Sequence, residues 1–125
     1  MLLDTCALLW LVQGGGLLTA ATRDLINKEL VVYVSAISGF EIGIKQQKGK
    51  LTLPADPVDW FNTVVEHHDL RILPLDLQTC IHSTRLPPIH ADPCDRFIIA
   101  TAQIHQLRIV TADKIFSQYD VAVLR

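Results

Sequence analysis

Short runs of apolar residues alternate along the chain with longer stretches that carry the marks of helices. The apolar runs are rich in leucine, isoleucine and valine, and unbroken runs of this kind are typical of strands covered on both faces. Four runs are predicted strands, and a run near residue 121 is a fifth candidate. They cover residues 1–3, 30–34, 70–73, 108–111 and 121–124.

The stretches between these strands begin with residues that cap helices. Thr19 and Ser35 are suited to accept hydrogen bonds from the first turn of a helix. Asp56 and Asp92 are capping residues too, and each is followed by proline, which is favoured at the first helical position. Predicted helices therefore cover residues 7–12, 19–28, 35–49, 56–68, 76–84 and 92–106.

Helical spacing also predicts which side chains of two helices are buried. The stripe of the helix that starts near Thr19 is expected to contain Ala20, Ala21, Leu25 and Ile26. In the helix after Ser35, one face is expected to contain Ile37, Phe40 and Ile44. Strands that alternate with helices need right-handed crossovers, which give a parallel sheet with helices on both faces. We therefore predict an α/β fold with a central parallel sheet of four to five strands.

Composition narrows the class of protein. At about 150 residues per domain, the 125 residues predict one domain over residues 1–125. Half of the residues are hydrophobic and 19% are charged, which excludes a disordered chain. No apolar run approaches a membrane span, and Asp4 stands where a secretion signal needs a basic residue. We predict a cytoplasmic protein with no membrane partner, and we expect reduced thiols at Cys6, Cys80 and Cys94.

The balance of charges argues against a simple basic module that binds nucleic acid. There are 11 Lys and Arg residues against 13 Asp and Glu residues, so the net charge is −2. A positive field over the whole protein is therefore not expected. An enzyme that meets phosphates through metal ions is compatible with this balance, because bound cations reverse the local charge of an acidic site.

Four acidic residues fall where a parallel sheet gathers ligands. Asp4 closes the first strand and Asp113 lies just beyond the fourth, so both belong to the carboxyl edge of the sheet, where open α/β sheets bind ligands. Asp95 lies in the first turn of the helix before the fourth strand, and Glu41 lies within the helix after the second. Such a cluster is costly unless cations neutralise it, and carboxylate oxygens suit Mg²⁺ or Mn²⁺. These residues predict a centre for metal-assisted phosphodiester cleavage.

Each acid alone also has a structural interpretation. Asp95 can favour its helix dipole and Asp113 can shape a turn. Glu41 can pair with Lys45 four residues further on, a contact worth about 0.2–0.5 kcal/mol on a helix surface. The convergence of four acids from separate segments favours a metal centre over these structural interpretations.

Two other sets of side chains offer weaker hypotheses. Structural zinc is disfavoured, because the ligand spacing is irregular in the set Cys80, His82, His90 and Cys94. Basic side chains after Glu41 either steer a phosphate backbone towards the acids or form a solvated helix end. They are Lys45, Lys48 and Lys50.

Four segments resemble, in order, the motifs of PIN-domain ribonucleases, and most closely those of the VapC-type toxins of toxin–antitoxin pairs. The first is Leu-Leu-Asp-Thr at residues 2–5, followed by Ala-Leu-Leu-Trp at 7–10. The second runs from Val-Ser-Ala at 34–36 through Glu41 to Gly-Lys-Leu at 49–51. The third joins Leu-Pro-Pro-Ile-His at 86–90 to Asp-Pro-Cys-Asp-Arg at 92–96, and the fourth is Ile-Val-Thr-Ala-Asp at 109–113. The resemblance spans nearly the whole chain.

This resemblance implies a fold, an activity and partners. The fold would be a PIN-like three-layer α/β/α sandwich. The activity would be that of a toxin, an endoribonuclease that depends on Mg²⁺ or Mn²⁺. The resemblance also implies a homodimer and a cognate antitoxin whose C-terminal segment covers the active site. DNA would be contacted only indirectly, through the antitoxin.

The resemblance further assigns roles to single residues. The catalytic acids would be Asp4, Glu41, Asp95 and Asp113, with Asp4 and Asp95 as direct metal ligands. Thr5 and Thr111 match hydroxyl positions near the acids, where they orient water or a carboxylate, or else serve in a cap or a turn. Arg96 matches an arginine that contacts phosphate or forms a salt bridge. Asp92 is expected to cap its helix and to lie outside the metal site.

The chain departs from the family pattern at three positions. Cys6 stands where histidine is more common, Phe40 where tryptophan is, and Cys94 where an aromatic residue is. None of these changes removes an acid, although they bear on substrate preference and redox sensitivity. The alternative function is a catalytically silent PIN-like binding module that acts through an antitoxin–DNA complex. A phosphatase of small phosphoesters would need an aspartate where Cys6 stands.

Overall fold

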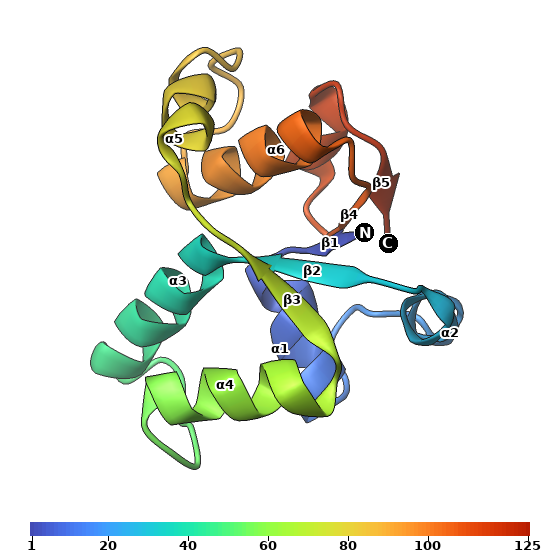
Figure 1. Cartoon of the computed structure of the whole chain (residues 1–125), viewed down its shortest axis with the longest axis vertical. Helices are drawn as coiled ribbons and strands as arrows, with labels where there is room; N and C mark the ends of the chain where they lie inside the picture. Colours follow the sequence, from blue (N-terminus) through green and yellow to red (C-terminus); the bar gives the residue numbers. More distant parts are fainter.

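The structure, a computed structural model, describes every residue from Met1 to Arg125 and contains a five-stranded sheet (Figure 1). All neighbouring strands are parallel, in the order β3-β2-β1-β4-β5. The strands are β1 (Leu2–Leu3), β2 (Val32–Ser35), β3 (Leu70–Leu73), β4 (Ile109–Val110) and β5 (Val123–Leu124). The predicted parallel sheet is confirmed, and the fifth candidate strand is part of it because it pairs with β4.

Alternate residues of the central strands face opposite layers of helices. In β1, Leu2 packs in one hydrophobic cluster and Leu3 packs in the other, and both side chains are fully buried. The neighbouring strand repeats the pattern, because Ile109 pairs with Leu2 and Val110 pairs with Leu3. This period of two, with apolar residues on both sides, explains why the strands are continuous apolar runs in the sequence.

Six α-helices and one 3₁₀ helix connect the strands. They are α1 (Thr5–Gln13), α2 (Ala20–Lys28), α3 (Ala36–Gln47), α4 (Pro57–His67), α5 (Leu77–Thr84), α6 (Pro93–His105) and η1 (Lys114–Gln118). The capping side chains of Thr19, Ser35, Asp56 and Asp92 each accept a backbone N–H, as predicted. Asp4 caps α1, so this helix begins two residues before the predicted start.

The helices form two layers around the sheet. Figure 1 shows α5 and α6 on one side of the sheet and α1 and α4 on the other. Helix α3 follows β2 and contacts both α4 and α6. It therefore lies where the two layers of helices meet. The predicted three-layer α/β/α sandwich is confirmed. None of its helices has the length and apolar character needed to cross a bilayer.

Two predictions about buried faces are only partly right. In α3, Ile37 is buried as predicted and Ile44 is half-buried, but Phe40 is 58% exposed, whereas Ile42 is fully buried. The inward stripe of this helix passes through Ser38 and Glu41, which are polar because they face the acidic end of the sheet. Apolar spacing alone therefore misplaced Phe40.

The helix α2 and the start of β2 show similar differences. Of the four residues predicted to be buried in α2, only Ile26 is; Ala20, Ala21 and Leu25 are exposed. The second strand begins at Val32 rather than at Leu30, and Leu30 is 96% exposed. Ile26 and Thr22 are the buried residues of this short peripheral helix, and most of its surface faces solvent.

Candidate active site

The acidic residues gather at the carboxyl edge of the sheet, as the sequence predicts. Asp4 directly follows β1, and its backbone N–H donates to the carbonyl of Val110 in β4 at 3.1 Å. Thr111 and Asp113 follow β4, so they emerge beside Asp4. The start of α3 brings Glu41 to the same edge, and the start of α6 brings Asp95.

The four predicted acids line one cleft of about 270 Å³. Lys45 is the one basic residue in the lining, and Asp92 is an additional acid. The rest of the lining consists of Thr5, Cys6, Trp10, Ala112 and Phe116. The structure thus brings together acids that are up to 109 positions apart in the chain, Asp4 and Asp113.

Asp4 is the most buried of these acids. Its side-chain Oδ1 accepts the backbone N–H of Ala7 at 2.7 Å, which caps α1. Burial raises the pKa of the Asp4 carboxyl, while donors on Thr111 and Ala7 oppose the shift. A carboxylate held in this way is a fixed oxygen donor that gains from a nearby cation.

A hydroxyl group at the start of α1 holds the Glu41 carboxylate in place. The Thr5 Oγ1–H donates to Glu41 Oε1 at 2.6 Å, and Thr5 Oγ1 also lies 2.9 Å from Ser38 Oγ. Burial raises the pKa of Glu41, and the bond from Thr5 opposes it. Of the two roles predicted for Thr5, this contact fits the orienting of a carboxylate. The alternative pairing of Glu41 with Lys45 is not formed, since no nitrogen–oxygen contact within 4.0 Å joins them.

Asp95 lies at the centre of the negative charge. Carboxylate oxygens of Glu41, Asp92 and Asp95 all lie within 4.8 Å of one another. Burial is the largest cause that raises the pKa of Asp95 to about 7, and the charges of Asp92 and Glu41 add to it. Asp92 caps α6 as predicted, by accepting the Cys94 N–H at 2.8 Å. Its position in the acid cluster corrects the expectation that it would lie outside.

His90 occupies a position that sequence reasoning missed. Its Nε2 lies 3.0 Å from Asp95 Oδ2 and 3.1 Å from Asp113 Oδ2. In the sequence, His90 appeared in an irregular zinc set and at the end of the third family motif, without a role at the acids. The zinc set is not assembled, because His82 bonds instead to Gln103 Oε1 at 2.7 Å and no cysteine joins the groups that could hold a metal. The signals that could have identified His90 were that motif and its place two residues before the cap of α6.

Arg96 is held by backbone carbonyls of the preceding loop. Its guanidinium forms no salt bridge with an acid and donates instead to the carbonyls of Ser83, Leu86, Pro87 and His90. These four bonds fix the loop of residues 86–91 against α6. The phosphate contact of Arg96 stays a prediction.

Thr111 serves the turn after β4. Its Oγ1 accepts the backbone N–H of Asp113 at 3.0 Å, which fits the turn role, and its hydroxyl also bonds to the Asp4 carboxyl, which fits the orienting of a carboxylate. Asp113 in turn accepts the Ile115 N–H at 2.9 Å through Oδ1 and caps η1. Asp113 is thereby directed towards His90 and the cleft.

Two cysteines lie close to the acids. Cys6 is exposed and lines the cleft, and Cys94 is half-buried in the first turn of α6. Burial raises the pKa of the Cys94 thiol to about 11, and burial with the charge of Asp4 raises that of Cys6. Both side chains are therefore neutral thiols at neutral pH, which makes them poor nucleophiles and poor metal ligands.

The donor atoms of the cleft fit a hard divalent cation. They are carboxylate oxygens from separate elements, and their pKa values are raised first by burial and further by repulsion among the acids. Oxygen donors of this kind suit Mg²⁺ or Mn²⁺. Neighbouring thiols that stay protonated do not favour a softer ion.

Comparison with known proteins gives the same architecture. The PIN-domain family profile matches residues 1–122. Ribonuclease VapC22 of Mycobacterium tuberculosis is 29% identical over 115 residues, which cover 91% of this chain and 87% of that protein.

Solved structures of low sequence identity share the fold. FitAcB from Neisseria gonorrhoeae has a TM-score of 0.69 and 23% identity, covering 99% of this chain and 96% of that chain. VapBC2 from Rickettsia felis, bound to a DNA fragment from its promoter, has a TM-score of 0.72 and 13% identity, covering 98% and 96%. With the profile match over nearly its whole length, the chain belongs to the PIN-domain family.

Proposed function

We propose that the protein is a metal-dependent endoribonuclease toxin that cleaves RNA phosphodiester bonds and is neutralised by a cognate antitoxin. The observation that carries this proposal is the meeting of Asp4, Glu41, Asp95 and Asp113 in one cleft at the carboxyl edge of the sheet. Its similarity to a protein named a ribonuclease supports the RNA substrate. Residues 1–125 would act as one domain.

The acids divide into two roles in this proposal. Asp4 and Asp95 would hold Mg²⁺ or Mn²⁺ directly, and Glu41 and Asp113 would complete the ring directly or through water. A divalent cation bound there supplies a Lewis acid and lowers the pKa of a water that attacks the phosphodiester. The protein's own part is to hold the acids in place, through Thr5 for Glu41 and through the Ala7 N–H for Asp4.

Lys45 is the side chain best placed to meet the RNA backbone. It lines the cleft, whereas Lys48 and Lys50 are exposed beyond the end of α3. A single lysine beside a cluster of acids attracts a phosphate without cancelling the metal site. The two distal lysines fit a solvated helix end.

Protein partners form the second part of the proposal. The structures of FitAB and VapBC type are complexes of two proteins, and some contain DNA. We propose that this chain also binds an antitoxin, which would carry the DNA contact, since its own net charge is −2. We further propose a homodimer, because large apolar side chains on α3, α4, β3 and α5 are exposed. They are Phe40, Val58, Ile72, Leu77 and Ile81. The cytoplasmic location stays a prediction.

The direct test is cleavage of total cellular RNA by purified protein freed of antitoxin. Incubations with Mg²⁺, with Mn²⁺ and with EDTA would be compared for the wild type and for Asp95→Asn. We expect discrete fragments that require the metal and disappear in the variant. Fragments that persist in Asp95→Asn would reveal a contaminating nuclease. Folded protein that cuts no RNA with either metal would contradict the proposal and favour the silent binding module.

A further inference from the structure

We infer that His90 is a positioning residue: its Nε2–H donates to Asp113 and its Nε2 also contacts Asp95, so that the ring bridges the two carboxylates and holds them in place for the metal. This inference rests on the proposed function, because it assigns the cleft to a cation. The distances are 3.0 Å to Asp95 Oδ2 and 3.1 Å to Asp113 Oδ2. Only 10% of the His90 side chain is exposed, so water competes weakly for these bonds.

The other ring nitrogen determines what Nε2 does. His90 Nδ1 accepts the backbone N–H of Asp92 at 3.2 Å, so Nδ1 presents a lone pair there. In a neutral imidazole the proton must then lie on Nε2, which makes Nε2 a donor. A histidine that binds a metal through Nε2 needs the opposite tautomer, with its other nitrogen donating to an acceptor. These two hydrogen bonds therefore identify His90 as a donor to Asp113 and not as a metal ligand.

The ring is fixed on several sides. The Phe116 ring packs edge-on against it, with ring centroids 5.7 Å apart and an interplanar angle of 81°. The backbone N–H of His90 donates to Tyr119 Oη at 2.7 Å, and Tyr119 is buried. Phe116 lies in η1 and Tyr119 directly follows it. A segment that is distant from His90 in the sequence therefore fixes the direction of Nε2.

Arg96 fixes the loop that carries His90. Its guanidinium donates to the carbonyls of Ser83, Leu86 and Pro87 at 2.8–2.9 Å and to that of His90 at 3.3 Å. Arg96 follows Asp95 directly in α6, so one turn of helix carries both the acid and the arginine that brings His90 to it. A planar group with several donors suits this task, and lysine could not replace all of these bonds.

The bridge matters because two carboxylates otherwise repel each other across the cleft. Asp113 Oδ1 already accepts the Ile115 N–H, and its Oδ2 accepts the His90 Nε2–H. The same nitrogen lies 3.0 Å from Asp95 Oδ2, so it stands between the two carboxylates. Outer partners of metal-binding carboxylates typically contribute about 10–100-fold to metal affinity.

The test is Mn²⁺ binding by the full-length protein, followed by electron paramagnetic resonance of the free ion. His90→Leu removes the donor, and His90→Gln keeps an N–H of similar reach. His82→Leu is the matched control, because His82 is also half-buried and hydrogen-bonded but lies against Gln103. Thermal melts would establish that each variant is folded.

We expect Mn²⁺ affinity to fall by about tenfold or more in His90→Leu, to recover at least partly in His90→Gln, and to stay unchanged in His82→Leu. Spin-echo modulation of the bound ion should show no directly coordinated imidazole nitrogen. Unchanged affinity in His90→Leu, equal losses in His90→Leu and His90→Gln, or a coordinated imidazole would each overturn the inference. If the wild type bound no Mn²⁺, the proposed metal centre itself would fail, which distinguishes the two claims.

Discussion

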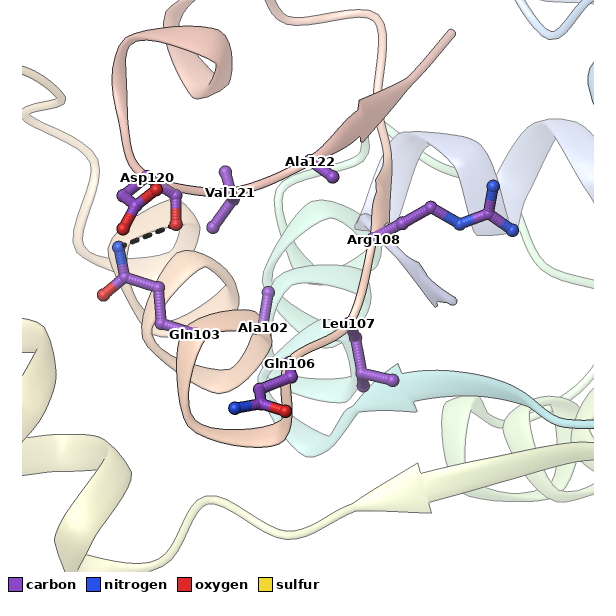
Figure 2. Close-up of a pocket in the computed structure, with 8 residues that line it drawn as sticks. All are labelled: Ala102, Gln103, Gln106, Leu107, Arg108, Asp120, Val121 and Ala122. Carbon is purple, nitrogen blue, oxygen red and sulfur yellow. Dashed lines mark hydrogen bonds between the residues drawn. The ribbon is translucent and has the colours of Figure 1, made fainter.

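The two edges of the parallel sheet differ in the side chains that line their cavities. At the amino edge, a hollow of about 480 Å³ lies between the end of α6 and the starts of β4 and β5. Figure 2 shows its polar side chains spread apart, with Gln103 donating to the Asp120 carbonyl and Arg108 extending away from both. At the carboxyl edge, a cleft of only about 270 Å³ gathers five acids.

The difference follows from the direction of the chain. Helices begin at the carboxyl edge, where Asp4 caps α1 and Asp92 caps α6, and the positive ends of these helices favour acidic side chains. Helices end at the amino edge, as α6 does before Gln106. Acidic side chains at that edge are therefore not stabilised by a helix dipole. The larger cavity is therefore not the reactive one, because charge and donor geometry decide the chemistry.

The largest effect on RNA cleavage is expected from a substitution in the acidic cleft, compared with one at the amino edge. Asp95→Asn removes a proposed ligand and should lower RNA cleavage by about 1,000-fold, equivalent to about 4 kcal/mol in the activation barrier. Asp120→Asn is the matched control at the amino edge, since Asp120 lines the larger hollow and is exposed. Initial cleavage rates on one defined RNA would measure both. Equal losses in the two variants would contradict the assignment of the acidic cleft.

A smaller effect is expected from the hydroxyl that supports Glu41. Thr5→Val preserves the shape of the side chain but removes the 2.6 Å bond to Glu41, so cleavage should fall by about 10–100-fold. Thr101→Val is the control, because Thr101 is equally buried but donates to the Phe97 carbonyl within α6. A Thr5→Val enzyme as active as the wild type would show that Glu41 does not need this partner.

Acid should weaken metal binding at the cleft. The pKa of Asp95 is about 7, and a cation binds the ionised carboxylate. Mn²⁺ affinity should therefore fall by about tenfold for each pH unit below about 7, and level off above it. Titrations at constant ionic strength between about pH 5.5 and about pH 8 would measure this profile. A flat profile would mean that Asp95 is not a ligand.

The smallest effect concerns stability without metal. An ordinary aspartate has a pKa of about 3.9 in the unfolded chain, so with a pKa of about 7 the folded protein holds a proton that the unfolded chain has lost. Stability should then decrease as pH rises between about 4 and about 7. At pH 8, metal-free Asp95→Asn should melt about 4 °C above the wild type, which corresponds to about 1 kcal/mol.

This gain should disappear at acidic pH, where the wild-type carboxyl is already neutral in the folded state. Added Mn²⁺ should raise the melting temperature of the wild type at pH 8 more than that of the variant. Asp120→Asn should change neither value. A variant that melted below the wild type at pH 8 would contradict the view that repulsion among the acids destabilises the free protein.

Local signals in the sequence explain how much of the fold and site was predictable. The caps at Thr19, Ser35, Asp56 and Asp92 act within a few residues, so they are readable without tertiary structure. The edge on which Asp4 and Asp113 meet followed from strand direction alone.

What the sequence missed depends on contacts between distant elements. His90 reaches the acids only because Arg96 and Tyr119 fix its loop, and no local pattern encodes that arrangement. Phe40 was assigned to the core because it is apolar, but the inward side of α3 is polar where it passes Ser38. Functional sites are expected to break the hydrophobic pattern in this way.

The most direct test of the central claim is to locate the metal. Crystals soaked in Mn²⁺ would be measured at a wavelength where manganese scatters anomalously. We expect an anomalous peak in the acidic cleft, within bonding distance of Asp4 and Asp95 and not of His90 Nε2. An empty cleft, or a peak in the larger hollow beside Gln103 and Asp120, would contradict it.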